Sequence, residues 1–129
     1  MNDQILFREE CYRIVGACVA VHREKGSGFV ESVYQDANEI ELKLSGIPFD
    51  RQRHFQLSYR GFPLRHSYTP DLLCFDRIIV ELKAFKCLTD DHRAQVINYL
   101  KVSRLQLGVL VNFGTPGRLE WERIVWTKE

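Results

Sequence analysis

The sequence lacks the features that would indicate a membrane protein or a secreted one. No apolar run approaches the roughly 20 residues needed to span a bilayer, and the amino-terminal stretch has no basic-then-apolar signal pattern. Neither charge sign dominates, because 18 Lys and Arg face 17 Asp and Glu for a net charge of +1. Overall charge therefore neither indicates nor excludes nucleic acid as a partner. We expect a cytoplasmic protein that makes no contact with a membrane.

Cysteine is scarce, and its spacing is wrong for the common metal motifs. The four cysteines include no Cys-x-x-Cys pair, whereas zinc and iron–sulfur sites usually contain one. Cys11 and Cys18 lie seven residues apart, which places them on one face of an expected helix. We interpret these two, together with Cys74 and Cys87, as buried free thiols.

What the sequence does contain is the composition of a soluble globular protein, with 45% hydrophobic and 27% charged residues in a chain of 129. A chain of this length can bury one core, so we predict a single domain over residues 1–129. The charge is uneven, since the segment 42–70 carries a local charge of about +4 from Lys43, Arg51, Arg53, Arg60, Arg65 and Asp50. A surface for nucleic acid and a solvated sheet face both explain this segment.

Three helices are predicted from apolar periodicity and capping residues. The first covers about residues 4–25 with Asn2 or Asp3 as its cap, the second runs from after Gly28 to about residue 45, and the third runs from Thr89 to about residue 103. The stripe expected to face the core in the second helix is Val30, Val33, Ala37, Ile40 and Leu44. The corresponding stripe of the third helix is Ala94, Ile97 and Leu100.

The strands are predicted from alternation and turn residues. A three-strand meander is expected over residues 51–59, from Phe62 through Asp71, and after Asp76, with Arg60-Gly61 as a two-residue turn. The continuous apolar run 105–113 is typical of a strand that is buried on both faces and reached by a helical crossover. Residues 119–126 supply a final, half-exposed strand.

The most informative stretch is 68–85, where two runs rich in β-branched and aromatic residues flank a polar break. This pattern predicts an antiparallel hairpin. A turn centred on Asp76 places Asp71 opposite Glu81, and opposed residues share one face of the hairpin. Lys83 follows Glu81 by two residues and therefore lies on the same face. Two carboxylates and one ammonium group then meet on one side of the hairpin.

This register leaves an alternative open. A turn centred between Asp76 and Arg77 would oppose Asp71 to Leu82 and separate the charged groups. The cluster therefore requires a loop with an odd number of residues.

Two adjacent carboxylates beside a lysine have a definite chemical use. When both are ionised they repel each other by roughly 4 kcal/mol at about 4 Å with an effective dielectric constant near 20. A hard cation such as Mg²⁺ or Mn²⁺ relieves this repulsion, and a nearby lysine can hold a water or neutralise charge on a phosphate. Glu81 and Lys83 alone are also explained by an ordinary ion pair on a half-exposed strand.

The order of these elements and motifs resembles the PD-(D/E)xK nuclease superfamily. Pro70-Asp71 lies on one expected strand and Glu81-x-Lys83 on the next, while Gly28-Phe-Val-Glu31-Ser-Val-Tyr34 resembles the motif that names the GxxExxY family. Residues 79–84, 92–101 and 108–114 are similar to the later sequence blocks of that family, so the resemblance spans about residues 21–125. It implies an α/β fold with a restriction-endonuclease-like core in the order α-α-β-β-β-α-β-β. A central mixed sheet would be flanked by helices.

The resemblance also implies roles for the residues of the metal site. Asp71 and Glu81 would bind the metal, with the Leu82 carbonyl as a further ligand. Glu31 would join the metal shell from the preceding helix. Lys83 would be the catalytic lysine.

A second set of residues is implied to face the substrate. Gln95 and Tyr99 match a Gln-x-x-x-Tyr motif in which the two residues steady the lysine and contact nucleic acid, so Gln95 also belongs to the catalytic set. We further predict Tyr34 and His22 among the residues that contact nucleic acid, although a histidine at the end of an apolar helix stripe is more often satisfied internally.

These implications predict a divalent-metal-dependent phosphodiesterase of the nuclease type, with Mg²⁺ or Mn²⁺ as its cofactor and DNA as the expected substrate. The alternative is a nucleic-acid-binding or adaptor domain that keeps the fold without turnover. Because cutting both strands of a duplex needs two sites, we also expect a homodimer or a partner protein. Trp121 and Trp126 are candidates for that contact, and core packing explains them equally well.

Overall fold

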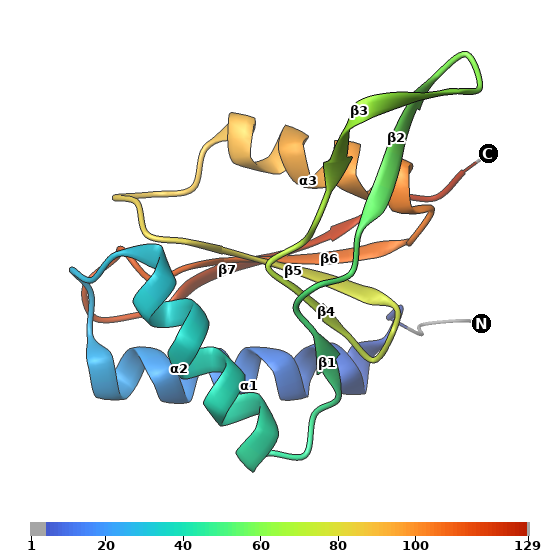
Figure 1. The fold of residues 1–129 in the computed structure, drawn as a ribbon. Helices are drawn as coiled ribbons and strands as arrows, with labels where there is room; N and C mark the ends of the chain where they lie inside the picture. Colours follow the sequence, from blue (N-terminus) through green and yellow to red (C-terminus); the bar gives the residue numbers. More distant parts are fainter. Residues whose placement is uncertain (1–4, 129) are drawn as a thin grey trace.

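Helices cover both faces of a central sheet, two on one side and one on the other (Figure 1). The computed structural model describes residues 5–128 of the chain. Helices α1 (Arg8–Lys25) and α2 (Glu31–Leu44) pack against each other beneath the sheet, and α3 (Asp90–Ser103) lies on the opposite face. The helix α1 begins later than predicted, at Arg8, and the predicted caps Asn2 and Asp3 lie outside the described residues.

The central sheet has five strands in the order β1-β4-β5-β6-β7. These strands are β1 (Phe49–Asp50), β4 (Leu72–Cys74), β5 (Ile78–Lys83), β6 (Leu107–Asn112) and β7 (Glu120–Val125). The strands β5 and β6 are parallel and joined through α3, while the other neighbours are antiparallel. The predicted mixed sheet with flanking helices is therefore confirmed, but the predicted element order is wrong in part, because five strands and not three lie between α2 and α3.

The core consists of two layers, one on each face of the sheet. Because side chains alternate along a strand, Val80 and Leu82 of β5 pack into the layer of α1 and α2, while Ile79 packs into the layer of α3. Every residue of β6 is buried, as expected for a parallel strand covered on both faces. Three thiols are buried within the layer of α1, but Cys87 is exposed, so the prediction of four buried thiols is wrong for that residue.

The apolar stripes predicted for two helices are also wrong in part. In α2 the buried residues are Tyr34, Asn38 and Leu42, whereas the predicted Ile40 and Leu44 are 60% and 78% exposed. The helix presents only a narrow face to α1 and β5, so its position against them, and not its apolar content, decides which residues are buried. In α3 the buried residues are Val96 and Leu100, and the predicted Ala94 is exposed.

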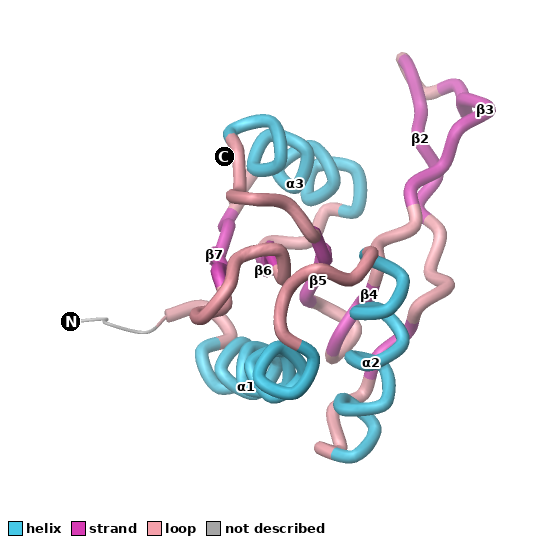
Figure 2. Tube along the Cα trace, turned by 90° about the vertical axis from the view of Figure 1, so that its left-hand side faces the viewer, coloured by secondary structure: helices cyan, strands magenta, loops and turns pink. Residues whose placement is uncertain are grey.

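The strands β2 (Phe55–Tyr59) and β3 (Phe62–Tyr68) form a separate two-stranded sheet. This hairpin projects away from the body of the protein (Figure 2). The two-residue turn Arg60-Gly61 is confirmed, with φ of 51° and 84° at its two positions, a pair of positive values that is typical of tight hairpin turns. The predicted three-strand meander is wrong, because β4 pairs with β1 and β5 and not with β3.

Over residues 5–128, none of the helices combines the length and the apolar character needed to cross a membrane. The two tryptophans occupy different environments, since Trp121 is 41% exposed and Trp126 packs against the core layer of α3.

Candidate active site

The turn between β4 and β5 fixes the register of the hairpin. The paired residues are Leu72 with Val80, Leu73 with Ile79 and Cys74 with Ile78. The connecting turn therefore has three residues, 75–77, two of which adopt positive φ. Extending this register by one pair places Asp71 opposite Glu81. The predicted odd-length loop is confirmed, and the alternative pairing of Asp71 with Leu82 is excluded.

Each of the two carboxylates is held by a backbone N–H of the opposite strand. The Asp71 N–H donates to Glu81 Oε2 at 3.1 Å, and the Leu82 N–H donates to Asp71 Oδ2 at 2.8 Å. The Tyr68 hydroxyl donates to the same Glu81 oxygen at 2.9 Å. The Glu81 side chain is buried, with 6% of its surface exposed, and these donors compensate part of the cost of that burial.

Burial disfavours the ionised form of both carboxyl groups. It raises the pKa of Glu81 to about 7, with a further contribution from the negative charge of Asp71, and the bonds from the Asp71 N–H and Tyr68 oppose the shift. Burial also raises the pKa of Asp71, against the Leu82 N–H and the charge of Lys83, while the charge of Glu31 raises it further. Such a pair accepts a cation readily, because added positive charge stabilises the ionised form of both groups.

Lys83 is held in place from the helix α3. Its Nζ donates to Gln95 Oε1 at 3.1 Å. The helix comes close to the sheet at Gly108, where an added Cβ would lie 2.6 Å from Val96 Cγ1. Thr89, predicted as the start of this helix, caps the amino end of α3 through its side chain. The absence of a side chain at Gly108 thus lets the helix bring Gln95 to the lysine.

The chain immediately after Lys83 is locked by the carboxyl end of β6. The side-chain amide of Asn112 accepts from the Phe85 N–H at 2.8 Å and donates to the Phe85 carbonyl at 2.9 Å. The Phe113 N–H donates to the Lys83 carbonyl at 2.8 Å. At Gly114 a Cβ would collide with the Phe85 backbone. Asn112 was not among the predicted site residues, although a polar residue inside an otherwise apolar run was an available signal.

Glu31 reaches the site from the first turn of α2. Together with Asp71 and Leu82 it lines a hollow of about 490 Å³. The full lining consists of Glu31, Ser32, Gln35, Arg51, Thr69, Pro70, Asp71 and Leu82. The Gln35 side chain donates to the Asp71 carbonyl at 2.9 Å, which ties α2 to the start of β4. Within residues 5–128, no three His, Cys, Asp or Glu side chains gather into a ready-made metal cluster. Asp71 thus faces the hollow, whereas the buried Glu81 is not part of its lining.

Two residues predicted to contact nucleic acid are instead packed inside the protein. Tyr34 has no exposed surface. Its hydroxyl donates to the Gly26 carbonyl at 2.6 Å, and its ring stacks on Phe113. His22 is 4% exposed, with Nε2 lying 2.9 Å from the Thr115 carbonyl. Both side chains fix loops beside the site, and their burial disagrees with the prediction that they touch nucleic acid.

Tyr99 remains partly accessible and belongs to an aromatic stack. Its ring lies parallel to that of Tyr68 with the centroids 3.6 Å apart, and Tyr68 in turn donates to Glu81. Tyr68 was not among the predicted site residues, because nothing in its local sequence indicates that β3 ends beside Glu81. The stack connects the Gln-x-x-x-Tyr segment of α3 with the buried carboxylate.

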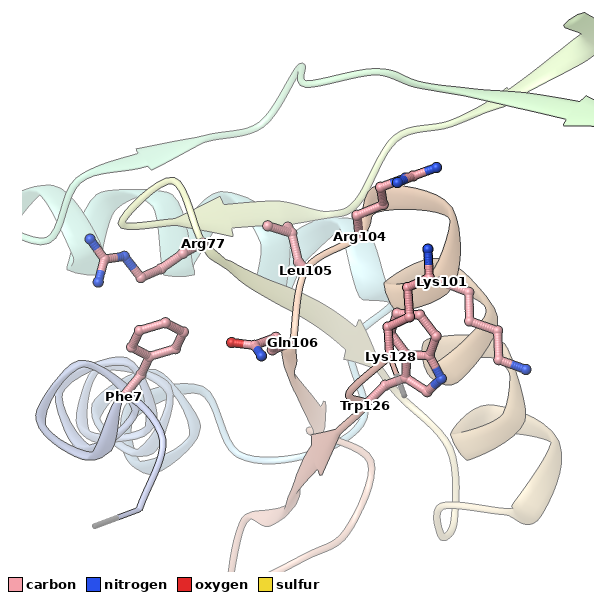
Figure 3. A pocket seen from close by; sticks show the side chains of 8 residues that line it. All are labelled: Phe7, Arg77, Lys101, Arg104, Leu105, Gln106, Trp126 and Lys128. Atoms are coloured by element: carbon pink, nitrogen blue, oxygen red, sulfur yellow. The ribbon is translucent and has the colours of Figure 1, made fainter. Parts of the chain in front are cut away.

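A second hollow, of about 590 Å³, lies at the other end of the sheet, near the amino ends of β5 and β6. Figure 3 shows Phe7 and Arg77 on one side of it and Lys101, Trp126 and Lys128 on the other. None of the predicted site residues lines this hollow. The carboxylates and the lysine thus belong to the opposite end of the molecule.

The fold and this arrangement of carboxylates define an α/β protein with a restriction-endonuclease-like core. The sequence profile described as the PD-(D/E)XK nuclease superfamily matches residues 8–124. The chain belongs to that superfamily.

Two further comparisons bear on the fold. The solved structure titled "Crystal structure of SSO0001" is similar to this protein, with a TM-score of 0.61 and 18% identity over 76% of this chain. The match covers 50% of the other chain, so the present protein spans about half the length of that relative, and the likeness supports the fold alone. No curated protein sequence matches this chain.

Proposed function

We propose that this protein is a divalent-metal-dependent nuclease that hydrolyses phosphodiester bonds in nucleic acid, with DNA as the expected substrate. The observation that carries the proposal is geometric. Asp71 and Glu81 lie opposite each other on one face of the β4–β5 hairpin, and Lys83 on the same strand is held by Gln95. Membership of a nuclease superfamily supports this chemistry.

The GxxExxY family is the branch of the superfamily that we propose for this chain. Gly28 adopts a φ of 113°, which favours glycine, and Glu31 opens the helix that follows it. Tyr34 completes the motif by bonding back to the Gly26 carbonyl and accepting from the Phe29 N–H at 3.3 Å. The motif therefore has a physical use here, because it fixes the loop that carries Glu31 to the hollow.

Asp71 and Glu81 are the proposed ligands of Mg²⁺ or Mn²⁺, with the Leu82 carbonyl and Glu31 in support. The donor set fits such a cation, because it consists of oxygen atoms and includes two buried carboxyl groups with raised pKa values. The formal charges also fit: three carboxylates and one lysine sum to −2, which a single divalent cation neutralises. When bound, the cation supplies positive charge to the phosphate and makes a water more acidic.

Lys83 is the residue that we propose to act on the attacking water and the phosphate. An ammonium group has three donors, and one of them is directed at Gln95 Oε1. The others are then available to orient a water or to stabilise negative charge on a phosphate oxygen. Attack of water at phosphorus and departure of the 3′ oxygen would leave a 5′-phosphate and a 3′-hydroxyl.

We further propose that the protein acts on duplexes as a homodimer or with a partner protein, because each chain offers a single candidate site among its described residues. An exposed apolar surface is available beside Tyr12 and Trp121, which are 76% and 41% exposed and line one hollow together. Light scattering at micromolar concentration would show whether the chain associates with itself.

The experiment that tests the function separates an enzyme from a binding domain. Wild type, Asp71→Ala, Glu81→Ala and Lys83→Ala are incubated with short single-stranded and double-stranded DNA and RNA in Mg²⁺, Mn²⁺ or chelator. Removing either carboxylate should abolish cleavage while binding is retained, and removing the lysine should abolish cleavage and weaken binding modestly. Asp36→Ala removes the same charge from an exposed position of α2 and serves as the control. A wild-type protein that binds but cuts none of these substrates would identify a binding domain.

A further inference from the structure

We propose that the β2–β3 hairpin is a nucleic-acid-binding arm that grips the substrate beyond the phosphate being cut. This inference rests on the proposed nuclease function and extends it to the way in which the substrate is held. The arm comprises residues 55–68.

Within residues 5–128, no helix or second sheet covers the outer part of the hairpin. Figure 1 and Figure 2 both show it extending away from the helices and the central sheet. Of the residues in β3, only Tyr68 at its base is buried. At the tip, Tyr59 and Phe62 are 65% and 74% exposed, and as register partners they share one face of the ribbon. Neighbouring exposed aromatic residues on a projecting element indicate an interaction surface.

The charge of the arm indicates the chemistry of the partner that it binds. The segment from Arg51 to Pro70 contains no acidic residue. Arg51 and Arg53 lie within 4 Å of Glu39 and Asp76. By contrast, Arg60 and Arg65 form no ion pair with any residue of the described range 5–128.

Free arginines beside exposed aromatic rings suit nucleic acid, because arginine binds phosphate and aromatic rings stack on bases. A second copy of the chain fits this surface less well. Its own hairpin would carry the same uncompensated positive charge, and like charges repel at a protein interface. The charge of the arm therefore favours a polyanion over self-association.

The base of the arm forms part of the candidate active site. The Phe55 ring stacks on Tyr68 with the centroids 6.2 Å apart, and Tyr68 stacks on Tyr99. The Tyr68 hydroxyl donates to Glu81. A strand bound at the carboxylates would consequently lie beside the root of the arm.

The arm has a defined shape near its middle. The register between β2 and β3 shifts after Gln56, and such bulges bend and twist a ribbon. The Gln56 side chain donates to the carbonyls of Leu57 and Leu64 at 2.9 and 2.8 Å, which satisfies backbone groups that the irregular pairing leaves open. The direction of the tip relative to the site is thus fixed by hydrogen bonds.

The length of the arm predicts how binding depends on substrate length. The seven residues of β3 extend about 23 Å at about 3.3 Å per residue. This distance corresponds to about seven base pairs at about 3.4 Å each. A duplex that extends only about four base pairs on either side of the site cannot reach the tip.

The test compares removal of two charges from the arm with removal of two charges elsewhere. Arg60→Ala/Arg65→Ala acts on the arm, and Lys101→Ala/Lys128→Ala acts on exposed lysines at the opposite end of the sheet. Affinity is measured in chelator for a duplex of 24 base pairs and for a hairpin-capped duplex of 8. We expect the arm variant to bind the long duplex on the order of tenfold more weakly, with a slope of log affinity against log salt that is shallower by about 2. The control should lose much less, and the short duplex, which reaches Arg65 but not Arg60 at the tip, should show a smaller difference between the two variants.

Three results would contradict the proposal that the hairpin binds nucleic acid. The first is equal affinity of the arm variant and wild type for the long duplex, and the second is an equal loss in the lysine control. The third is a wild-type dimer that the arm substitutions dissociate, as seen by light scattering, which would show that the hairpin binds a second copy. Cleavage of the short duplex by wild type in Mg²⁺ tests the nuclease function separately, since that substrate does not reach the tip.

Discussion

The hydroxyl of Tyr68 lies 2.9 Å from Glu81 Oε2 and donates a hydrogen bond to it inside the protein. This bond favours the ionised carboxylate and lowers its pKa, against the larger effect of burial. The end of β3 therefore contributes to the protonation equilibrium of a residue on β5.

Removing that hydroxyl should shift the pH dependence of cleavage. In Tyr68→Phe the pKa of Glu81 rises further, so less carboxylate is ionised at neutral pH and the pH–rate profile moves to higher pH. The variant should also lose about 1–2 kcal/mol of stability, since a buried acceptor loses a donor. Tyr99→Phe removes the hydroxyl of the stacked neighbour and should leave the profile in place. Identical profiles for Tyr68→Phe and wild type would contradict this role.

Stability without metal should fall as the pH rises. The pKa of Glu81 lies at about 7 in the folded protein and at its ordinary 4.5 when unfolded, so the folded state holds a proton that the unfolded state has released. The stabilisation is fully present below the lower value and is lost as the pH rises through the higher one. The raised pKa of Asp71 acts in the same direction. Urea denaturation in chelator between about pH 5 and pH 8 should show this decline in wild type, and a shallower one in Glu81→Gln. A decline in the variant that is as steep as in wild type, or steeper, would contradict the raised pKa of Glu81.

The contact between Gln95 and Lys83 should act on turnover more than on binding. Gln95→Ala removes the oxygen that holds Lys83 Nζ, so the lysine loses its fixed position and the cleavage rate should fall about tenfold. Gln95→Glu keeps an acceptor and should retain more activity. Asn98→Ala, at an exposed position of the same helix, is the control. Single-turnover cleavage rates and affinities are measured together for each variant. A loss confined to affinity would contradict the role of Gln95 in positioning Lys83.

Replacing two glycines by alanine should change the stability of the protein in opposite directions. At Gly114 a Cβ would overlap the Phe85 backbone, so Gly114→Ala should destabilise the protein by about 2–4 kcal/mol or displace the chain after Lys83. At Gly16, in the middle of α1, nothing lies within 4 Å of an added Cβ, and Gly16→Ala should stabilise the helix by about 0.5–1 kcal/mol. Thermal unfolding of both variants tests these expectations. If Gly114→Ala leaves stability unchanged, the chain at Gly114 is not packed tightly against the Phe85 backbone.

The parts of the fold that the sequence could predict depend on local patterns. The polar break at Asp76 between two apolar runs was enough to locate the hairpin. It left two registers open, and the structure has the one that pairs Asp71 with Glu81. The buried strand β6 was recognisable from its continuous apolar run, and Thr89 marked the start of α3.

The parts that could not be predicted depend on contacts between distant segments. The exposed Leu44 and the buried Asn38 of α2 reflect where that helix meets its neighbours, which its own periodicity does not reveal. The separation of β2 and β3 from the central sheet follows from the choice of β1 as the partner of β4. Likewise, Tyr68 contacts Glu81 only because the hairpin returns to the sheet at that point.

The most direct test of the nuclease account is single-turnover cleavage of a DNA duplex of 24 base pairs by wild type, Asp71→Asn and Asp36→Asn. The amide at position 71 keeps the shape of the side chain and removes the charge that a cation needs, whereas Asp36 is exposed on α2 and does not line the hollow. The account predicts cleavage that requires Mg²⁺ or Mn²⁺, falls by at least about 100-fold in Asp71→Asn, and is unchanged in Asp36→Asn. Cleavage that persists in chelator, or that Asp71→Asn performs as fast as wild type, would contradict it.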